Sequence, residues 1–440
     1  MTTLRFSLPV SLAAGCVAAL ALPTHVPAAV PAPQPVLTRD PATLDTLLAR
    51  YDRMPPGPER DALALVIDKH AGQRYATVSR LYWYTDLDAA EAAAKASHKP
   101  ILALKMLGRL DEDLSCANSR MFRTTLYANE TVSKFLRSNF VLYWSSERPV
   151  PRVTIDFGDG RRIESTTTGN SAHYVLDETG VVLDVLPGLY APPAFTAELT
   201  ESLALAKQVA PLAPEQRAAD IRRYHAAAGQ QIARDWNAIA GAPYLPASRQ
   251  LLTQAEVDTV LARAQRATMA KAFIEVPQLR AITAGTDPGQ ISESELALWA
   301  SAGQKTWNIG DPIVASASIW KAAVAPPKPT RATKDVLDAR SRALIAQLHN
   351  AGATKATESA TATMIARLEQ HIVADSAINQ YKLRRQIHAR LATETAPATF
   401  ADLNTWIYAV VFHTPRTDAW LGLLPRTDFT GLPGDGALVP

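Results

Sequence analysis

Cysteine is nearly absent from this sequence: the 440 residues contain two, Cys16 and Cys116. Cys16 lies within an apolar N-terminal stretch. If that stretch is removed, Cys116 is the single thiol of the mature chain. A chain with one thiol can form no internal disulfide, even in a compartment that permits disulfides.

Other signatures of common function classes are also missing. Lys and Arg number 45 and Asp and Glu 42, and the net charge of +3 is too weak to favour nucleic acid or an anionic surface as a partner. The chain has no Gly-x-Gly-x-x-Gly sequence and no P-loop lysine, so we predict no cofactor. The stretch GNSAH at 169–173 lacks the Gly-x-Ser-x-Gly form and does not support a serine hydrolase.

The histidines of the C-terminal half give no metal-binding pattern. His349, His371 and His388 fall on separate predicted helices, and none has a second histidine at His-x-x-x-His spacing. Glu369 is too close in sequence to His371 to share its helix face. We therefore predict no metal site from these residues.

The N-terminal 28 residues are typical of a secretory signal peptide. The apolar run at 6–23 follows a single positive charge, and small-residue cleavage sites occur at 19–21 and 26–28. Pro9 and the shortness of the run argue against a permanent spanning helix, although a retained anchor is a second alternative. The sequence AAGC, ending at Cys16, resembles a bacterial lipoprotein site and is a third. We expect a periplasmic or secreted protein that contacts a membrane only if Cys16 is lipidated.

The length of the chain predicts two or three domains. We divide the mature chain into a proline-rich linker with N-terminal helices at 29–75, an α/β domain at 76–208 and a mainly α-helical domain at 209–440. In the last domain, the apolar stripes of a long helix at about 358–392 and of the stretch 399–415 indicate core packing. A groove for a partner is the alternative interpretation of these stripes.

The α/β domain alternates helical and strand-like patterns. The continuous apolar run ILALKML predicts a strand that is buried on both faces. Asp88 and Glu91 have the spacing of a capping box for the helix before it. The expected elements, in order, are a strand at 81–86, a helix at 86–100, a strand at 101–107, a helix that begins at or near Cys116, a short helix at 129–139, a strand at 140–144, a hairpin around 158–160, a second hairpin at 173–190 and a helix at 192–207.

This order of elements resembles the thioredoxin fold over residues 76–208. The match is nearest to thioredoxin-like families whose domain opens with the pattern W…A…A…KP, which is formed here by Trp83, Ala90, Ala94, Lys99 and Pro100. The resemblance implies a three-layer α/β domain with a redox motif at the start of the helix that follows the first central strand.

The spacing downstream continues the resemblance. In those families the first cysteine of a Cys-x-x-Cys motif lies sixteen residues before a valine of the next short helix, and Cys116 and Val132 have this separation. Ser119, however, stands where the second cysteine would be. The fold also has a cis-proline facing the motif, and no proline occurs near 171–172. The dithiol chemistry of the family therefore does not carry over to this chain.

Cys116 is the first candidate site residue. A cysteine at a helix N-terminus has its thiolate favoured by unpaired N–H groups, and Arg120 and Arg123 would add to this effect, whereas the acidic residues at 111–113 oppose it. Ser119 can donate a hydrogen bond to the sulfur but cannot resolve a mixed disulfide. The alternatives are a reactive single thiol and an inert, half-buried cysteine.

His173 is the other candidate. By the resemblance it lies in the loop that faces Cys116, where an imidazole would favour the thiolate. The alternative is a histidine packed in the sheet. Two functions follow: a non-enzymatic, thioredoxin-like interaction module of the cell envelope with a protein partner, or an extracytoplasmic monothiol oxidoreductase that acts on a thiol-containing substrate through Cys116, Ser119 and His173.

Overall fold

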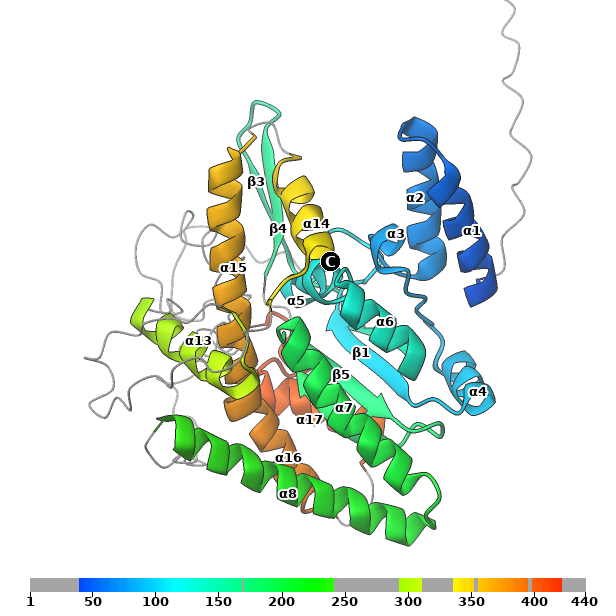
Figure 1. Ribbon diagram of the computed structural model, residues 1–440, viewed down its shortest axis with the longest axis vertical. Coiled ribbons are helices and arrows are strands. Elements are labelled where there is room, and N and C mark those ends of the chain that lie inside the picture. The colour runs from blue at the N-terminus through cyan, green and yellow to red at the C-terminus, as the bar shows by residue number, and fades with distance from the viewer. Residues whose placement is uncertain are drawn as a thin grey trace, which may run out of the picture. The chain divides into compact units, whose positions relative to one another are not determined.

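Figure 1 shows the computed structural model of the chain, coloured from blue on the N-terminal side to red on the C-terminal side. The structure describes residues 39–167, 170–240, 293–310, 335–351, 355–394 and 398–421. The predicted signal peptide lies outside these residues. Within them, no helix combines the length and the apolar character that crossing a membrane requires.

A four-stranded mixed sheet organises the first half of the described chain. β1 (Ile101–Leu107) lies between β2 (Val141–Arg148), which runs parallel to it, and β5 (Ser171–Leu176), which runs antiparallel. β6 (Val182–Pro187) pairs with β5 at the edge, giving the order β2-β1-β5-β6. The continuous apolar run predicted β1, because a strand covered on both faces needs no polar alternation. The mixed α/β class predicted from the sequence is confirmed at this level.

Side chains cap three of the helices before and between these strands, and the capping residues are Asp40, Asp86 and Asn129. Asp86 accepts a hydrogen bond from the Ala89 N–H at 2.8 Å and so caps the helix that follows, rather than the Asp88 and Glu91 pair predicted from the sequence. The elements are α1 (Pro41–Arg53), α2 (Pro58–Ala71), α3 (Ala76–Ser79), α4 (Leu87–Ser97), α5 (Ala117–Met121), the π-helical segment η1 (Phe122–Leu126), α6 (Glu130–Asn139) and α7 (Pro192–Val209).

A separate two-stranded hairpin joins β2 to β5. It consists of β3 (Arg152–Asp156) and β4 (Arg162–Thr166), and Figure 1 shows it extending away from the four-stranded sheet. Its turn contains Gly158 and Gly160, both at positive φ, as the glycine-rich turn predicted. The strand predicted at 81–86 is instead a single parallel bridge between Tyr84 and Tyr143.

The described part of the C-terminal half is helical. The helix predicted at about 358–392 is confirmed as one continuous run with a π-helical middle, and α8 packs on α16 while α13 packs on α15. The elements are α8 (Pro214–Ala240), α13 (Glu293–Trp307), α14 (Ala339–His349), α15 (Glu358–Ile378), η2 (Asn379–Arg384), α16 (Arg385–Leu391), α17 (Phe400–Trp406) and η3 (Ile407–Val411).

Helices from distant parts of the sequence cover the two faces of the sheet. His173 and Tyr174 are adjacent in β5 and therefore point to opposite faces. On one face the His173 ring lies 4.6 Å from that of Phe122 and 4.9 Å from that of Phe195, between centroids. On the other face the Tyr174 hydroxyl donates to Asn404 Oδ1 of α17 at 2.9 Å. The C-terminal helices are thus part of the packing around the sheet.

Candidate functional site

Cys116 lies at the N-terminus of α5, at the edge of the sheet where β1 ends. Its N–H donates to the carbonyl of Leu107, the last residue of β1, at 3.3 Å. Its Sγ lies 3.2 Å from Ser171 Oγ, at the first residue of β5. The start of the helix and the start of β5 therefore meet as the topology predicted. The side chain is fully buried, with 0% of the residue exposed.

Ser119 does not make the contact with the sulfur that we expected. Its hydroxyl donates to Ser115 Oγ at 2.5 Å and lies 3.0 Å from the Cys116 carbonyl oxygen. A hydroxyl has one proton to donate, and that proton is used here within the first turn of α5. Ser171 is the hydroxyl that contacts the sulfur. It was not among the predicted site residues, since only the pairing of β5 with β1 brings it there.

His173 is packed in the sheet, which was the alternative to a Cys–His pair. Its Nε2 lies 2.7 Å from the hydroxyl of Tyr127, and the residue is fully buried. Burial lowers the pKa of His173 to about 3, so the imidazole is neutral at physiological pH. A neutral ring supplies no positive charge to a thiolate. Within the described chain, no hydrogen bond joins His173 to Cys116.

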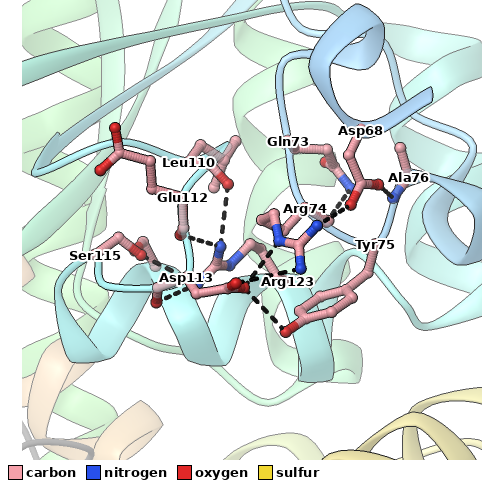
Figure 2. A network of polar contacts seen from close by, with 11 residues as sticks. Asp68, Gln73, Arg74, Tyr75, Ala76, Leu110, Glu112, Asp113, Ser115 and Arg123 are labelled. Carbon is pink, nitrogen blue, oxygen red and sulfur yellow. Dashed lines mark hydrogen bonds and ion pairs between the residues drawn. The ribbon is translucent and has the colours of Figure 1, made fainter. Parts of the chain in front are cut away.

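Arg123 forms hydrogen bonds to the loop before Cys116. Its charge is therefore not free to stabilise a thiolate at the sulfur. Figure 2 shows its guanidinium pointing into the loop, and the dashed lines end on loop acceptors. It donates to the carbonyl of Glu112 at 2.5 Å and to Ser115 Oγ at 3.1 Å. Carbonyls of Leu110 and Asp113 accept at 3.2 and 3.3 Å. Burial lowers the pKa of Arg123 to about 10, which still leaves it charged at neutral pH.

The acidic residues of the loop have their own partners. Arg74 donates to Asp113 and to Asp68, at 2.8 Å in each case, and Figure 2 shows it between the two carboxylates. Arg109 pairs with Asp111 at 2.7 Å. The charged side chains that could favour or oppose a Cys116 thiolate are therefore mostly engaged in hydrogen bonds and ion pairs around the loop.

The C-terminal segment covers the loop beside Cys116. The Tyr408 hydroxyl donates to the Asn170 carbonyl at 2.9 Å, and Asn170 Nδ2 donates to the Phe412 carbonyl at 3.4 Å. Tyr408 and Phe412 are themselves buried. Burial raises the pKa of Tyr408 well above its usual value, with smaller contributions from Tyr174 and Cys116. The apolar stripe at 399–415 predicted core packing, but not that it lies against this loop.

A cavity of about 610 Å³ occurs elsewhere, at the end of the sheet where β1 begins. Its lining includes Lys99, Pro100, Asp177, Leu203 and Arg217, and does not include Cys116.

No family model, curated protein or solved structure matches the chain. Its function must therefore be inferred from its own residues.

Proposed function

We propose that the protein is a secreted or periplasmic thioredoxin-like protein without dithiol redox chemistry, which acts as an interaction module of the cell envelope. The observation that carries this proposal is the burial of Cys116, which would be the single thiol of the mature chain. Cys116 Sγ is buried and contacts Ser171, next to Asn170, whose carbonyl accepts a hydrogen bond from Tyr408 of the C-terminal segment. A sulfur in this position cannot meet a disulfide of another protein.

The arrangement of the strands supports the thioredoxin-like part of the proposal. A parallel pair, β1 and β2, is followed in the sheet by the antiparallel strands β5 and β6, and the helix that follows β1 begins at the cysteine. The bridge from Tyr84 to Tyr143 adds a short segment beside β2. The described residues after 209 are helical, which supports the helical character proposed for the C-terminal half, and these helices pack against the sheet.

Chemistry at the site supports a role other than reduction. Release of a reduced product from a mixed disulfide requires a second thiol, and residue 119 is a serine whose hydroxyl is bonded to Ser115. The neutral His173 ring is hydrogen-bonded to Tyr127, and within the described chain no hydrogen bond positions it to take a proton from Cys116. In an insulin-reduction assay with dithiothreitol, we expect the wild-type protein to match the background of Cys116→Ser.

The alternative is a monothiol oxidoreductase that uses Cys116. It requires residues 407–412 to leave the 170–171 loop so that a thiol-containing substrate can reach the sulfur. The two functions differ in their dependence on the thiol, because an interaction module binds its partner through surfaces and an oxidoreductase binds through sulfur.

Cross-linking in the native host separates the two. An amine-reactive cross-linker should give the same complexes with the wild type and with Cys116→Ser, and dithiothreitol should not remove them. Complexes that form without a cross-linker, disappear with dithiothreitol and are lost in Cys116→Ser would favour the oxidoreductase.

The proposed location follows from the N-terminus. An apolar run at 6–23 with cleavage sites at 19–21 and 26–28 supports export and a mature chain that starts between about residues 22 and 33. Mass spectrometry of the protein from its native host would show this start. An intact Met1, or a lipid on Cys16, would replace simple secretion with one of the anchored alternatives.

A further inference from the structure

A second buried polar cluster lies outside the Cys116 site. Asp184 of β6, His225 of α8 and His388 of α16 come together there, and all three are buried. Each offers one ligand atom, and these atoms lie within 4.8 Å of one another. His225 Nδ1 and His388 Nδ1 are 2.7 Å apart. Residues separated by 163 positions in the sequence thus face each other in the interior.

The lone pairs of two ring nitrogens 2.7 Å apart repel each other unless a proton or a cation lies between them. In a pair of neutral imidazoles, one Nδ1 proton can fill the gap. The Nε2 atom of His388 is buried without a hydrogen-bond partner in the described structure. Both rings are buried in the interior, and the neutral imidazole is the form that binds metals.

Asp184 is held so that one oxygen retains capacity for another ligand. Its Oδ2 accepts from Ser202 at 2.7 Å, Tyr224 at 2.9 Å and Arg384 at 2.7 Å. In the described part of the chain, its Oδ1 accepts one hydrogen bond, from the Val185 N–H at 2.7 Å, and a carboxylate oxygen has two lone pairs. Donors that fix the far oxygen of a ligating carboxylate are the usual support of a metal site.

The charge of the cluster also favours a cation. Arg384 forms ion pairs with both Asp184 and Glu198, so two carboxylates share one guanidinium. Arg384 donates to Asp184 Oδ2 at 2.7 Å, and this ion pair favours the ionised carboxylate. With neutral histidines, the five side chains carry one net negative charge in a buried space.

We propose that Asp184, His225 and His388 form a binding site for a divalent transition metal, with zinc as the ion that fits best. Two imidazole nitrogens and one carboxylate oxygen are ligands that zinc prefers. At Zn–N distances of about 2.0–2.1 Å, two tetrahedral ligand nitrogens are about 3.3 Å apart. The two Nδ1 atoms would therefore separate by about 0.6 Å, a small rotation of two rings.

The site joins three elements, so the metal would have a structural role. It would fix α8 and α16 against β6, far apart in sequence but joined here by their ligands. A metal that binds only the folded chain stabilises it by mass action. This inference does not rest on the thioredoxin-like proposal, since it uses no residue of the Cys116 site.

The test is a zinc titration of untagged, full-length mature protein after treatment with EDTA. We expect calorimetry to show one zinc equivalent bound and the melting temperature to rise with zinc. His98→Gln, which removes an exposed histidine, should bind like the wild type. His225→Gln and His388→Gln should lose the bound equivalent. Tyr224→Phe keeps all three ligands but removes one of the three donors to Asp184 Oδ2, and should weaken binding roughly 10- to 100-fold.

Two results would overturn the proposal. The first is a folded wild-type protein that binds no zinc and shows no change in melting temperature. The second is zinc binding that survives in folded His225→Gln and His388→Gln. If either variant fails to fold, the cobalt-substituted wild type decides: a tetrahedral visible spectrum supports the site, and an octahedral one contradicts it.

Discussion

Cys116 Sγ lies 3.2 Å from Ser171 Oγ, and this contact joins the first turn of α5 to the first residue of β5. Either atom can be the donor. The pair is buried, and the chain covers the loop next to it with its own residues 407–412. The thiol therefore serves as a packing group with a polar partner. We therefore expect the contact to affect the stability of the fold rather than catalysis.

A double-mutant cycle on Cys116→Ala and Ser171→Ala should show a favourable coupling. A neutral hydrogen bond with sulfur is weak, so we expect a coupling energy of about 0.5–1 kcal/mol in the free energy of unfolding. Urea unfolding of the four proteins measures it. The pair Cys116→Ala and Ser133→Ala serves as a control, because Ser133 is equally buried and bonds within α6 instead. Additive effects for both pairs would contradict the role given to the contact.

Arg123 should be one of the residues on which the 109–115 loop depends. Arg123→Met removes hydrogen bonds to three carbonyls and to Ser115, and two of these bonds, to the Leu110 carbonyl and to Ser115 Oγ, are buried. We expect a loss of about 2–4 kcal/mol in the free energy of unfolding. Arg123→Lys should recover little of it, because one ammonium cannot reach acceptors placed for a planar fork.

The control for this prediction is Arg120→Met. The guanidinium of Arg120 donates to Thr166 Oγ1 at 3.0 Å, and the residue is half-buried. Its loss should cost clearly less than the loss of Arg123. Equal urea midpoints for the two variants would show that the bonds to the loop do not decide its stability.

The buried His173 should make the protein sensitive to acid. Its folded-state pKa of about 3 lies below its ordinary value of 6.5, so the unfolded chain binds a proton at a pH where the folded chain does not. Stability is then complete above pH 6.5 and is lost as the pH falls from 6.5 towards 3. For one such group the loss between pH 7 and pH 5 is about 2 kcal/mol.

His173→Gln removes this titration and can keep a hydrogen bond to Tyr127. Its unfolding free energy should fall less between pH 7 and pH 5 than that of the wild type, although its stability at pH 7 is lower. His98→Gln, at an exposed position, is the matched control. An unchanged slope in His173→Gln would mean that the imidazole is not neutral in the folded state.

Tyr408 should control access to Cys116. Tyr408→Ala removes the hydroxyl that holds the Asn170 carbonyl and the ring that packs against Phe412 at a centroid distance of 5.4 Å. A loss of about 1.4 kcal/mol in the local opening free energy already raises the alkylation rate of Cys116 about tenfold. We expect at least this increase from peptide mapping after iodoacetamide treatment.

Tyr381→Ala is the control for Tyr408→Ala. Tyr381 is also buried, but it packs against Trp236 and bonds to Thr306. The two variants should be compared under conditions that unfold equal fractions of each. If both accelerate alkylation equally, the effect is global destabilisation, and residues 407–412 are not a cover.

Local elements could be predicted from the sequence because their signals are local. The apolar run at 101–107 identified β1, and the position of Cys116 after a polar loop placed it at a helix start. The glycine-rich turn at 158–160 located the hairpin. The cap predicted at Asp88 was wrong, because Asp86 is the capping residue. The exact start of a helix is hard to predict where two acidic residues two positions apart both suit a helix N-terminus.

The groups that meet across long distances could not be predicted. Ser171 reaches Cys116 through the pairing of β5 with β1, and Tyr408 reaches the same loop from a distance of 238 residues. One sequence pattern could have identified His225 as a core residue: it lies on the same helix face as the buried Ile221 and Ile232 of α8. A histidine in such a stripe requires a partner in the core, but the sequence does not say which one.

The alkylation rate of Cys116 in the native wild-type protein, measured from pH 6 to pH 9 against the urea-unfolded chain, tests the central claim most directly. If the thiol reacts only after the covering residues open, the native rate should be slower than the unfolded rate by about a thousandfold or more. A native rate close to the unfolded one, and already maximal at neutral pH, would show an exposed thiolate and would contradict the account of Cys116 as a buried packing group.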